Sequence, residues 1–562
     1  MLSQAGIKNA IEKARLNIAR DWLIIFLNKN FSGGNIVDKD TSGTIRRAER
    51  FHIVLIGEGL MVGGIAGFVV ILYRMALEFA GDALNHILQH ARQNLLWAAC
   101  WFSALLILAW AVGKLLAFEP MISGSGIPQL EGEMAGKLDP VWWKVIGAKF
   151  LGGFLCLLGG LALGREGPSI QLGAMAGKGV SKGLDRGKTE ERFLLTCGAS
   201  AGLAAAFHAP LAGVMFSLEE VHKNFSVSVL MSVMASSLTA DFLSSTVFGM
   251  SPVFSFQITE PLPIGHYGMI VALGVLLGIL GAFYNWFTLK VQSMYNQAGF
   301  LNRTSKLMIP FVLSGIIGLA APELLGSGHS LIEYLTNVDV MLGTVIFILM
   351  SRFVYSAVCF GSGAPGGIFF PLLVLGGFIG GAFATVAVQY FGLDAMYINN
   401  FVLLAMAGYF SAIVRAPLTG IILIFEMTGS LSQMLSLSIV SIVAYITATF
   451  LKSKPIYESL LERLLERQKK QVEDADEPAQ ETCHGQKILD SFVVQFTSQL
   501  DGAAISEVEW PANCLLVAIQ RGSEEIIPRG RTRLQVGDVV VTLTDERDMA
   551  NVRDKVQELC SS

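Results

Sequence analysis

The chain has few charged side chains for its length. Of its 562 residues only 15% are charged, whereas 52% are hydrophobic, and an average soluble protein carries about 25% charged residues. The formal net charge is −4 and the basic residues form no long stripe, so no nucleic-acid partner is expected. Most of the chain is therefore predicted to lie in membrane lipid.

Residue patterns for metal or cofactor chemistry are also scarce. The seven cysteines are scattered, with no CxxC and no histidine at metal-ligand spacing. There is no HExxH pattern and no TVGYG filter sequence. We therefore expect no metal, no cofactor and no enzymatic activity, and we interpret the cysteines as small buried hydrophobic residues.

The first 50 residues are polar and contain nine lysines or arginines, with no secretory signal. Residues 5–28 are predicted to form an amphipathic helix on the membrane surface, followed by a linker to residue 50. By the positive-inside rule, this end of the chain is expected to be cytoplasmic.

Between residues 52 and 450, long apolar runs alternate with short breaks rich in glycine, proline and serine. Many runs are shorter than the ~20 residues that a full membrane span needs, and the 59 glycines suit closely packed, interrupted helices. Helices that stop inside the membrane are predicted at 123–133, 166–182, 210–220, 367–386 and 416–428.

The apolar region contains an internal repeat. Residues 209–219 (APLAGVMFSLE) align with residues 416–426 (APLTGIILIFE) at an offset of 207, and Gly164–Pro168 aligns with Gly367–Pro371 at an offset of 203. The membrane domain, residues 51–460, is therefore predicted to consist of two halves, about 51–250 and 265–451. Such a repeat of interrupted helices predicts a binding site between the halves near the membrane midplane, with both chain ends in the cytoplasm.

The sequence becomes polar after the last apolar run. Residues 461–485 are predicted to be a charged linker that begins as a helix, and residues 486–562 a small α/β domain. Strands are predicted at 493–496, 515–520, 525–527 and 539–543, followed by a helix at 545–559.

Three glycine-bracketed segments predict a site for an anion: Gly124–Pro128, Gly164–Pro168 and Gly367–Pro371. Each places free backbone N–H groups at the start of a helix, where an anion can bind without a full cation. Ser125 and Tyr457 are candidate hydroxyl donors. One such cluster alone could be a packing or kink device, but three together favour the anion site.

Four acidic residues in apolar surroundings need an explanation. Glu166 is expected to face a transport pathway, and the alternative is a salt bridge to Arg165. In the repeat, Glu219 aligns with Glu426 and is interpreted as structural, whereas Glu220 aligns with Met427 and could serve a proton route. The alternative for Glu220 is a solvated helix end. Glu131 and Lys149 are predicted to form a buried ion pair.

The three segments, read as GSGIP, GREGP and GIFFP, resemble the signature of the CLC family of chloride channels and chloride/proton exchangers, and the similarity covers about residues 50–460. The resemblance implies an all-α membrane protein with an inverted repeat of broken, tilted helices, and a homodimer with one pore per subunit. It implies a chloride site made by Ser125, Tyr457 and the backbone N–H groups of Ile368 and Phe369, to which we add Gly126, Arg165, Gly167 and Phe370 from the same segments.

The same resemblance implies that Glu166 is the external gating glutamate and Glu220 the internal proton acceptor, a residue that exchangers generally have. It thus favours a chloride/proton antiporter, with a passive voltage- or pH-gated chloride channel as the alternative. Ser125 is the form associated with chloride, and bromide or nitrate are further candidates. His208 occupies a position where relatives often carry asparagine.

The tail resembles the C-terminal domain of potassium-conductance regulators and TrkA-type proteins through residues 519–528 (IQRGSEEIIP) and 535–549 (QVGDVVVTLTDERDM). No GxGxxG follows a strand, so the nucleotide-binding half that often precedes this domain is not expected. The resemblance implies a prokaryotic source, and thus a bacterial inner membrane. A small regulatory ligand at this domain is a hypothesis.

Overall fold

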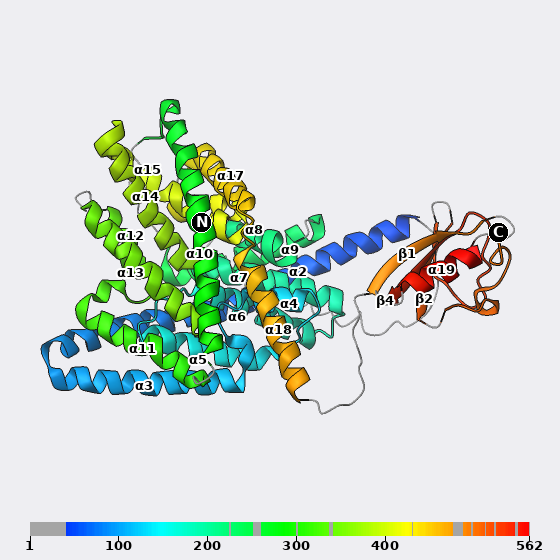
Figure 1. Cartoon of the computed structure of the whole chain (residues 1–562), viewed down its shortest axis with the longest axis horizontal. Helices are drawn as coiled ribbons and strands as arrows, with labels where there is room; N and C mark the ends of the chain where they lie inside the picture. Colours follow the sequence, from blue (N-terminus) through cyan, green and yellow to red (C-terminus); the bar gives the residue numbers. More distant parts are fainter. Residues whose placement is uncertain are drawn as a thin grey trace, which may run out of the picture. The chain divides into compact units, whose positions relative to one another are not determined.

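The computed structural model in Figure 1 describes residues 41–560 apart from 224–225, 251–259, 299–301, 337–340, 430, 476–486, 496–497, 512, 522–523 and 546–548. The predicted amphipathic helix at 5–28 lies outside the described residues. The chain divides into two compact units, Met1–Arg467, here called the membrane unit, and Gln468–Ser562, here called the tail.

The first half of the membrane unit consists of helices of very different lengths. Their bounds are α2 (Thr41–Gln93), α3 (Leu95–Phe118), η1 (Pro120–Ile122), α4 (Ile127–Met134), α5 (Trp142–Leu158), α6 (Glu166–Gly183), α7 (Lys188–Phe207), α8 (Pro210–Phe216), η2 (Ser217–His222) and α9 (Val227–Phe248). Helix α2 begins inside the predicted polar linker, because no proline interrupts residues 41–52 and an existing helix extends at low cost.

The second half repeats this alternation of long and short helices. Their bounds are η3 (Ile264–His266), α10 (Tyr267–Gln297), α11 (Arg303–Ala320), η4 (Pro322–Leu324), α12 (His329–Thr336), α13 (Leu342–Gly361), α14 (Phe369–Phe391), η5 (Ala395–Tyr397), α15 (Ile398–Val414), α16 (Pro417–Thr428), η6 (Leu431–Gln433), α17 (Met434–Phe450) and α18 (Ile456–Ala475).

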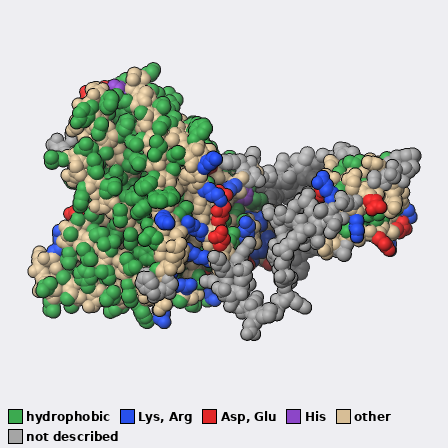
Figure 2. All heavy atoms as spheres, in the orientation of Figure 1, with side chains coloured by type: hydrophobic (Ala, Val, Ile, Leu, Met, Phe, Trp, Pro, Cys, Tyr) green, Lys and Arg blue, Asp and Glu red, His purple; other side chains and the backbone are tan. Residues whose placement is uncertain are grey.

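Seven of the described helices are long and apolar enough to cross a membrane. Large apolar side chains point outward from them, including Phe79, Ile107 and Phe347, and hydrophobic side chains cover most of the visible face of this unit in Figure 2. A surface of this kind is stable in lipid rather than in water. The unit is therefore a multi-pass membrane domain.

The two halves pack in the same way. Helix α2 packs against α9, and α6 against α7, in the first half, whereas α10 packs against α17, and α14 against α15, in the second. The close packing of α6 on α7 depends on glycine, since a methyl group on Gly198 would lie 2.1 Å from the Gly173 carbonyl oxygen. Gly198–Gly202 has the GxSxG spelling of some hydrolases, but it lies inside helix α7 and its glycines serve this packing.

Short helices are present at four of the five predicted places, as α4, α6, α8 and α16, whereas α14 is longer than predicted and ends at Phe391. Helices α8 and α16 each begin at a proline, which suits a helix start because it has no N–H to leave unpaired. The Glu219 carboxylate accepts bonds from the Leu418 and Thr419 amides at 3.3 and 2.8 Å, so the structural interpretation of Glu219 is confirmed.

The repeat-related Glu426 makes the corresponding contacts in the other half. Its carboxylate accepts bonds from the Leu211 and Ala212 amides at 2.9 and 2.7 Å. Helix α16 therefore supplies a carboxylate to the N-terminus of α8, and η2, which directly follows α8, supplies one to the N-terminus of α16, where a negative charge is most stabilising.

The tail contains a four-stranded antiparallel sheet among its described residues, in the order β1-β4-β2-β3, with helix α19 (Met549–Cys560) at its end. The strands are β1 (Lys487–Val493), β2 (Cys514–Arg521), β3 (Glu524–Ile526) and β4 (Val539–Asp545). The predicted α/β domain is confirmed, but β1 lies earlier than the predicted 493–496. Strand β1 was not recognised from the sequence because it contains polar residues, as expected when only one face of a strand is buried.

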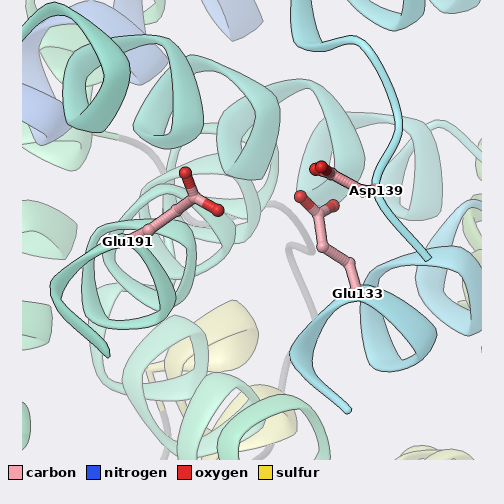
Figure 3. Close-up of side chains that lie close together, drawn as sticks. All are labelled: Glu133, Asp139 and Glu191. Atoms are coloured by element: carbon pink, nitrogen blue, oxygen red, sulfur yellow. The ribbon is translucent and has the colours of Figure 1, made fainter. Parts of the chain in front are cut away.

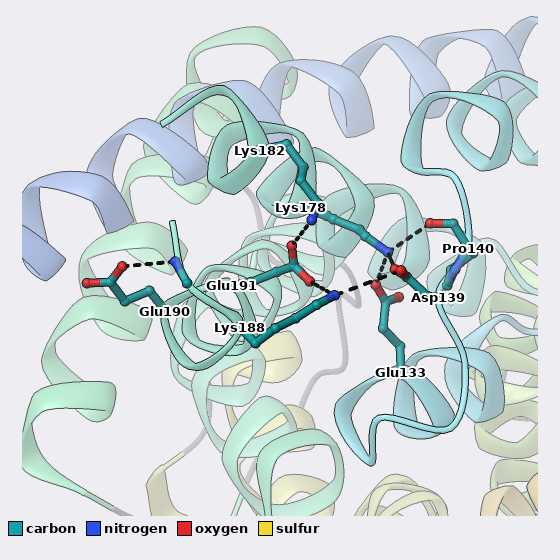
Figure 4. A network of polar contacts seen from close by, with 9 residues as sticks. Glu133, Asp139, Pro140, Lys178, Lys182, Lys188, Glu190 and Glu191 are labelled. Carbon is teal, nitrogen blue, oxygen red and sulfur yellow. Dashed lines mark hydrogen bonds and ion pairs between the residues drawn. The ribbon is translucent and has the colours of Figure 1, made fainter. Parts of the chain in front are cut away.

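A buried network of charges joins the loop before α5 to helices α4, α6 and α7. Lys178, on α6, places its Nζ 2.5 Å from Glu133 Oε1 and 2.6 Å from Asp139 Oδ1, and Lys188 lies 3.0 Å from Glu191 (Figure 4). Carboxylate oxygens of Glu133, Asp139 and Glu191 lie within 4.8 Å of one another (Figure 3). Because lysine ammonium groups lie among these carboxylates, the cluster is an ion-pair network.

Replacing Lys178 by methionine is expected to destabilise the membrane unit by about 3–5 kcal/mol, the cost of leaving a buried acid without its partner. Lys188→Met is the matched control: its side chain is 69% exposed, against 2% for Lys178, and it should cost less than about 1 kcal/mol. Thermal unfolding in detergent measures both, and equal losses for the two variants would contradict the assignment.

The tail contains a bidentate ion pair that should make its stability depend on pH. Arg521 donates to both carboxylate oxygens of Asp538, at 2.8 and 2.7 Å, which lowers the pKa of Asp538. A lowered pKa stabilises the fold above the ordinary aspartate pKa of about 3.9 and ceases to do so as the pH falls through the folded-state value.

We therefore expect the tail to lose stability below about pH 4, and Asp538→Asn to weaken that pH dependence. Hydrogen exchange of the β4 amides, corrected for the intrinsic effect of pH on exchange, would follow both. Unchanged pH dependence in the variant would show that other groups govern the acid response.

Candidate functional site

Three glycine-rich segments that are far apart in the sequence meet inside the membrane unit. Gly164 and Gly367 form both backbone hydrogen bonds of a short antiparallel bridge, at 2.7 and 2.8 Å. The Gly366 amide donates to the Gly124 carbonyl oxygen at 3.0 Å. These bonds join the turns that precede α4, α6 and α14, so the N-termini of the three helices are held together.

Close backbone approach explains the glycines of these turns. A methyl group on Gly167 would lie 2.9 Å from both Cβ and the carbonyl oxygen of Ser125. Gly124 and Gly126 have φ values of +64° and +90°, a region that glycine enters at no steric cost. The sequence therefore brings the starts of α4 and α6 into direct contact.

The residues predicted to bind the anion gather at these helix starts. Ser125, Ile368, Phe369 and Phe370 are all buried, and Ile368 is the residue that caps α14, where the first N–H groups of a helix have no partner within it. The Phe369 ring packs 4.6 Å from that of Phe410, measured between centroids, which fixes the start of α14.

The two candidate hydroxyl donors, Ser125 and Tyr457, are both buried. The Ser125 hydroxyl oxygen accepts a bond from the Ile127 amide at 3.4 Å, so its proton is free to be donated. The Tyr457 hydroxyl is fully buried and has no hydrogen-bond partner among the described residues. A buried hydroxyl without a partner is costly, and a bound anion would satisfy it.

Two cavities approach these residues. A cavity of about 790 Å³, here called the large cavity, is lined by Glu166, Arg165 and Phe370. Another of about 50 Å³, here called the small cavity, is lined by Ser125 and Arg463. The two linings share no residue, so protein separates the cavities between Glu166 and Ser125.

Glu166 is the first residue of α6 and only 1% exposed. The backbone N–H groups of Glu166 and Phe370 are directed at its carboxylate, and one carboxylate oxygen, Oε2, has no hydrogen-bond partner among the described residues. Arg165 Nε lies 3.9 Å from Oε1, which is too long for a hydrogen bond. Glu166 therefore occupies a helix N-terminus, and the alternative salt bridge exists only as a long contact.

Glu220 lies in the π-helical turn η2 and is 6% exposed, so it is not the solvated helix end considered as an alternative. Its carboxyl group lies next to that of Glu131, and Lys223 Nζ lies 4.0 Å from Glu131 Oε2. Two buried carboxyl groups this close repel each other when both are ionised. Glu220 is therefore a buried acid beside a second one, an arrangement that suits a proton acceptor inside a membrane protein.

The predicted ion pair of Glu131 and Lys149 is wrong. The Lys149 ammonium donates instead to the carbonyl oxygens of Ile122 and Gly124, at 2.9 and 2.7 Å. The turn before α4 leaves these carbonyl groups without helical partners, and a buried ammonium must be fully hydrogen-bonded. Lys149 therefore supports the turn that presents Ser125, a role that residue type alone did not indicate.

A closed, buried site made of helix N-termini and hydroxyl groups, with a carboxylate at one of those N-termini, defines a class of membrane proteins that conduct or carry small anions. The chain belongs to the voltage gated chloride channel family, which it matches over residues 103–449. Residues 491–557 match the TrkA-C domain. Both resemblances inferred from the sequence are thus confirmed.

The chain is 36% identical to the H(+)/Cl(-) exchange transporter ClcA of Vibrio cholerae serotype O1 (strain M66-2), over 74% of this chain and 90% of that relative. It is 34% identical to the protein of the same name from Salmonella schwarzengrund, over 78% and 96%. The structure of a slow cyanobacterial Cl-/H+ antiporter is similar, with a TM-score of 0.70 and 30% identity, over 74% of this chain and 99% of that one.

Gly167→Ala should reduce chloride binding and flux by roughly tenfold or more, because the added methyl group separates α6 from Ser125 and overpacking costs ~1–3 kcal/mol. Gly183→Ala, on the same helix, is the matched control, since a methyl group there meets nothing within 4 Å. Calorimetric titration of chloride and efflux from liposomes measure the effect. Wild-type affinity in Gly167→Ala would contradict the proposed site.

Proposed function

We propose that this protein is a chloride/proton antiporter, which moves chloride across the membrane against protons moving the opposite way. The observation that carries the proposal is the placement of two buried acids: Glu166 at the large cavity, and Glu220 beside Glu131. Tyr457 lies within electrostatic range of Glu166, Glu220 and Glu131. Family membership and the exchange transporters among the relatives support the same conclusion.

The anion site in this proposal consists of Ser125, Tyr457 and the N–H groups of Ile368 and Phe369. These groups are neutral, so they hold chloride weakly enough for it to leave, which transport requires. The ionised Glu166 carboxylate is itself an anion at a helix N-terminus and competes for this position. When a proton neutralises Glu166, its side chain can leave and chloride can pass.

Proton movement distinguishes the antiporter from a passive channel. A proton reaching Glu166 from the large cavity must continue to the other side, and we assign the next step of that route to the buried Glu220–Glu131 pair. A channel needs no such second acceptor. Glu220 therefore favours exchange, and the passive channel remains the alternative.

We further propose the assembly and location that the family implies: a homodimer with one pore in each subunit, in a bacterial cell membrane, with both chain ends in the cytoplasm. The basic first 50 residues support this orientation. The large cavity then opens to the outside. A small ligand that binds the tail and changes transport is a hypothesis that deletion of residues 470–562 would test.

The proposal is tested in liposomes that carry a chloride gradient, with the external pH recorded. We expect chloride to drive protons uphill in the wild type. Glu166→Ala and Glu220→Gln should each abolish proton movement while chloride flux persists, because each removes one proton acceptor. Glu462→Gln, an exposed acid paired with Lys454, is the control and should keep full coupling.

One result would count against exchange, and another against the role of Glu166. Chloride flux without proton movement in the wild type, unaltered in Glu220→Gln, would leave the channel. Uphill proton movement in Glu166→Ala would show that Glu166 is not the gating residue.

A further inference from the structure

The charges of the large cavity are arranged by depth. Its acidic side chains Asp82, Glu323 and Glu333 are exposed, and water screens exposed charges strongly. Arg74 lies deeper, with a side chain 13% exposed, and Arg165 is also partly buried. Apart from Glu166, the charges of this cavity that water screens least are therefore on two arginines.

One carboxylate oxygen, Glu78 Oε1, lies near both of these guanidinium groups. Arg74 Nε donates to Glu78 Oε1 at 3.3 Å, and Arg165 Nη1 lies 3.9 Å from the same oxygen. Glu78 is 49% exposed, so solvent weakens its charge further. The group of three side chains keeps a net positive charge close to Glu166.

His208 holds Arg74 in this position. Arg74 Nη1 lies 2.8 Å from His208 Nε2, and the guanidinium carbon lies 3.8 Å from the centroid of the Phe248 ring. A guanidinium group can only donate, so His208 Nε2 must be the acceptor. The ring proton is then on Nδ1, which lies 3.4 Å from both Asp241 Oδ1 and Ser245 Oγ.

We propose that Arg74 is a second anion-attracting residue at the mouth of the pathway, beside Arg165, and that His208 is the positioning residue that holds it there. The inference rests on the proposed anion transport. It adds two residues that the three glycine segments do not include, and it gives a physical role to the histidine that stands where relatives often have asparagine.

Protonation of His208 would change this arrangement. A proton on His208 Nε2 would oppose the Arg74 N–H, so that bond is lost, but Glu78 and the Phe248 ring still hold Arg74. The cavity gains one positive charge. The other titratable groups that face it are Tyr73, Asp82, Glu166, Glu323, His329 and Glu333, in addition to Glu78 and Asp241.

The test measures initial chloride uptake into right-side-out membrane vesicles at several external chloride concentrations, at external pH 7.5 and 5.5. Arg74→Gln should raise the KM for external chloride about threefold, the effect of one nearby partly screened charge, with the maximal rate within about twofold of wild type. Arg74→Lys keeps the charge and should restore the wild-type KM.

In the wild type, we expect acidification from pH 7.5 to 5.5 to lower the KM about threefold. His208→Asn keeps an acceptor oxygen but cannot be protonated, so this decrease in KM should be absent from the variant. His90→Asn, an exposed histidine on the same helix as Arg74, is the control and should keep that decrease. A wild-type KM in Arg74→Gln, or a wild-type pH response in His208→Asn, would overturn the inference.

Proton movement is recorded in the same vesicles. If the wild type carries chloride without moving protons, the proposed exchange fails, and the KM values still decide the role of Arg74. If exchange is observed and the KM of Arg74→Gln is unchanged, only the inference about Arg74 fails.

Discussion

The pair of backbone hydrogen bonds between Gly164 and Gly367 is the contact on which the rest of the site depends. It joins the two halves of the repeat at their equivalent turns and points the N-termini of α6 and α14 at a common region. The bond from Gly366 to Gly124 adds the start of α4. We propose that the anion is bound where the N-termini of these three helices meet, since a helix N-terminus attracts an anion without carrying a full charge.

The absence of a full charge on these N–H groups matters because the site is buried in the membrane unit. A buried lysine beside the anion would hold it too tightly for transport, whereas the buried Lys149 has its ammonium bonded to backbone carbonyl oxygens. Full charges occur instead at the margins of the pathway, on Arg165 and Arg74 in the large cavity and Arg463 in the small one. Charge attracts the anion at these cavities, and dipoles bind it between them.

Much of this could be predicted from the sequence, because helix starts leave local signals. Glycine and proline marked the beginnings of α4, α6, α8 and α16, and the repeat separated Glu219 from Glu220. The partners of buried charges were not predictable in this way. Lys149 was paired with Glu131 from residue type, whereas its real partners are carbonyl groups, which every residue has.

The contact of Arg74 with His208 was missed for a related reason. The two residues are 134 positions apart, and nothing in the apolar pattern of α2 or α7 indicates that these helices bring them together. Residue type gives the charge of a side chain, but the packing of neighbouring helices determines which group that side chain contacts. Contacts between helices were therefore the part of the site that required the structure.

The central claim is that the anion binds between the two cavities, at the helix starts. Anomalous scattering from crystals grown in bromide tests it most directly, because bromide has the charge of chloride and can be located without ambiguity. The account predicts a bromide peak within hydrogen-bond distance of the Ser125 and Tyr457 hydroxyl groups and the Ile368 and Phe369 amides. Bromide found only beside the arginines of the cavities would contradict it.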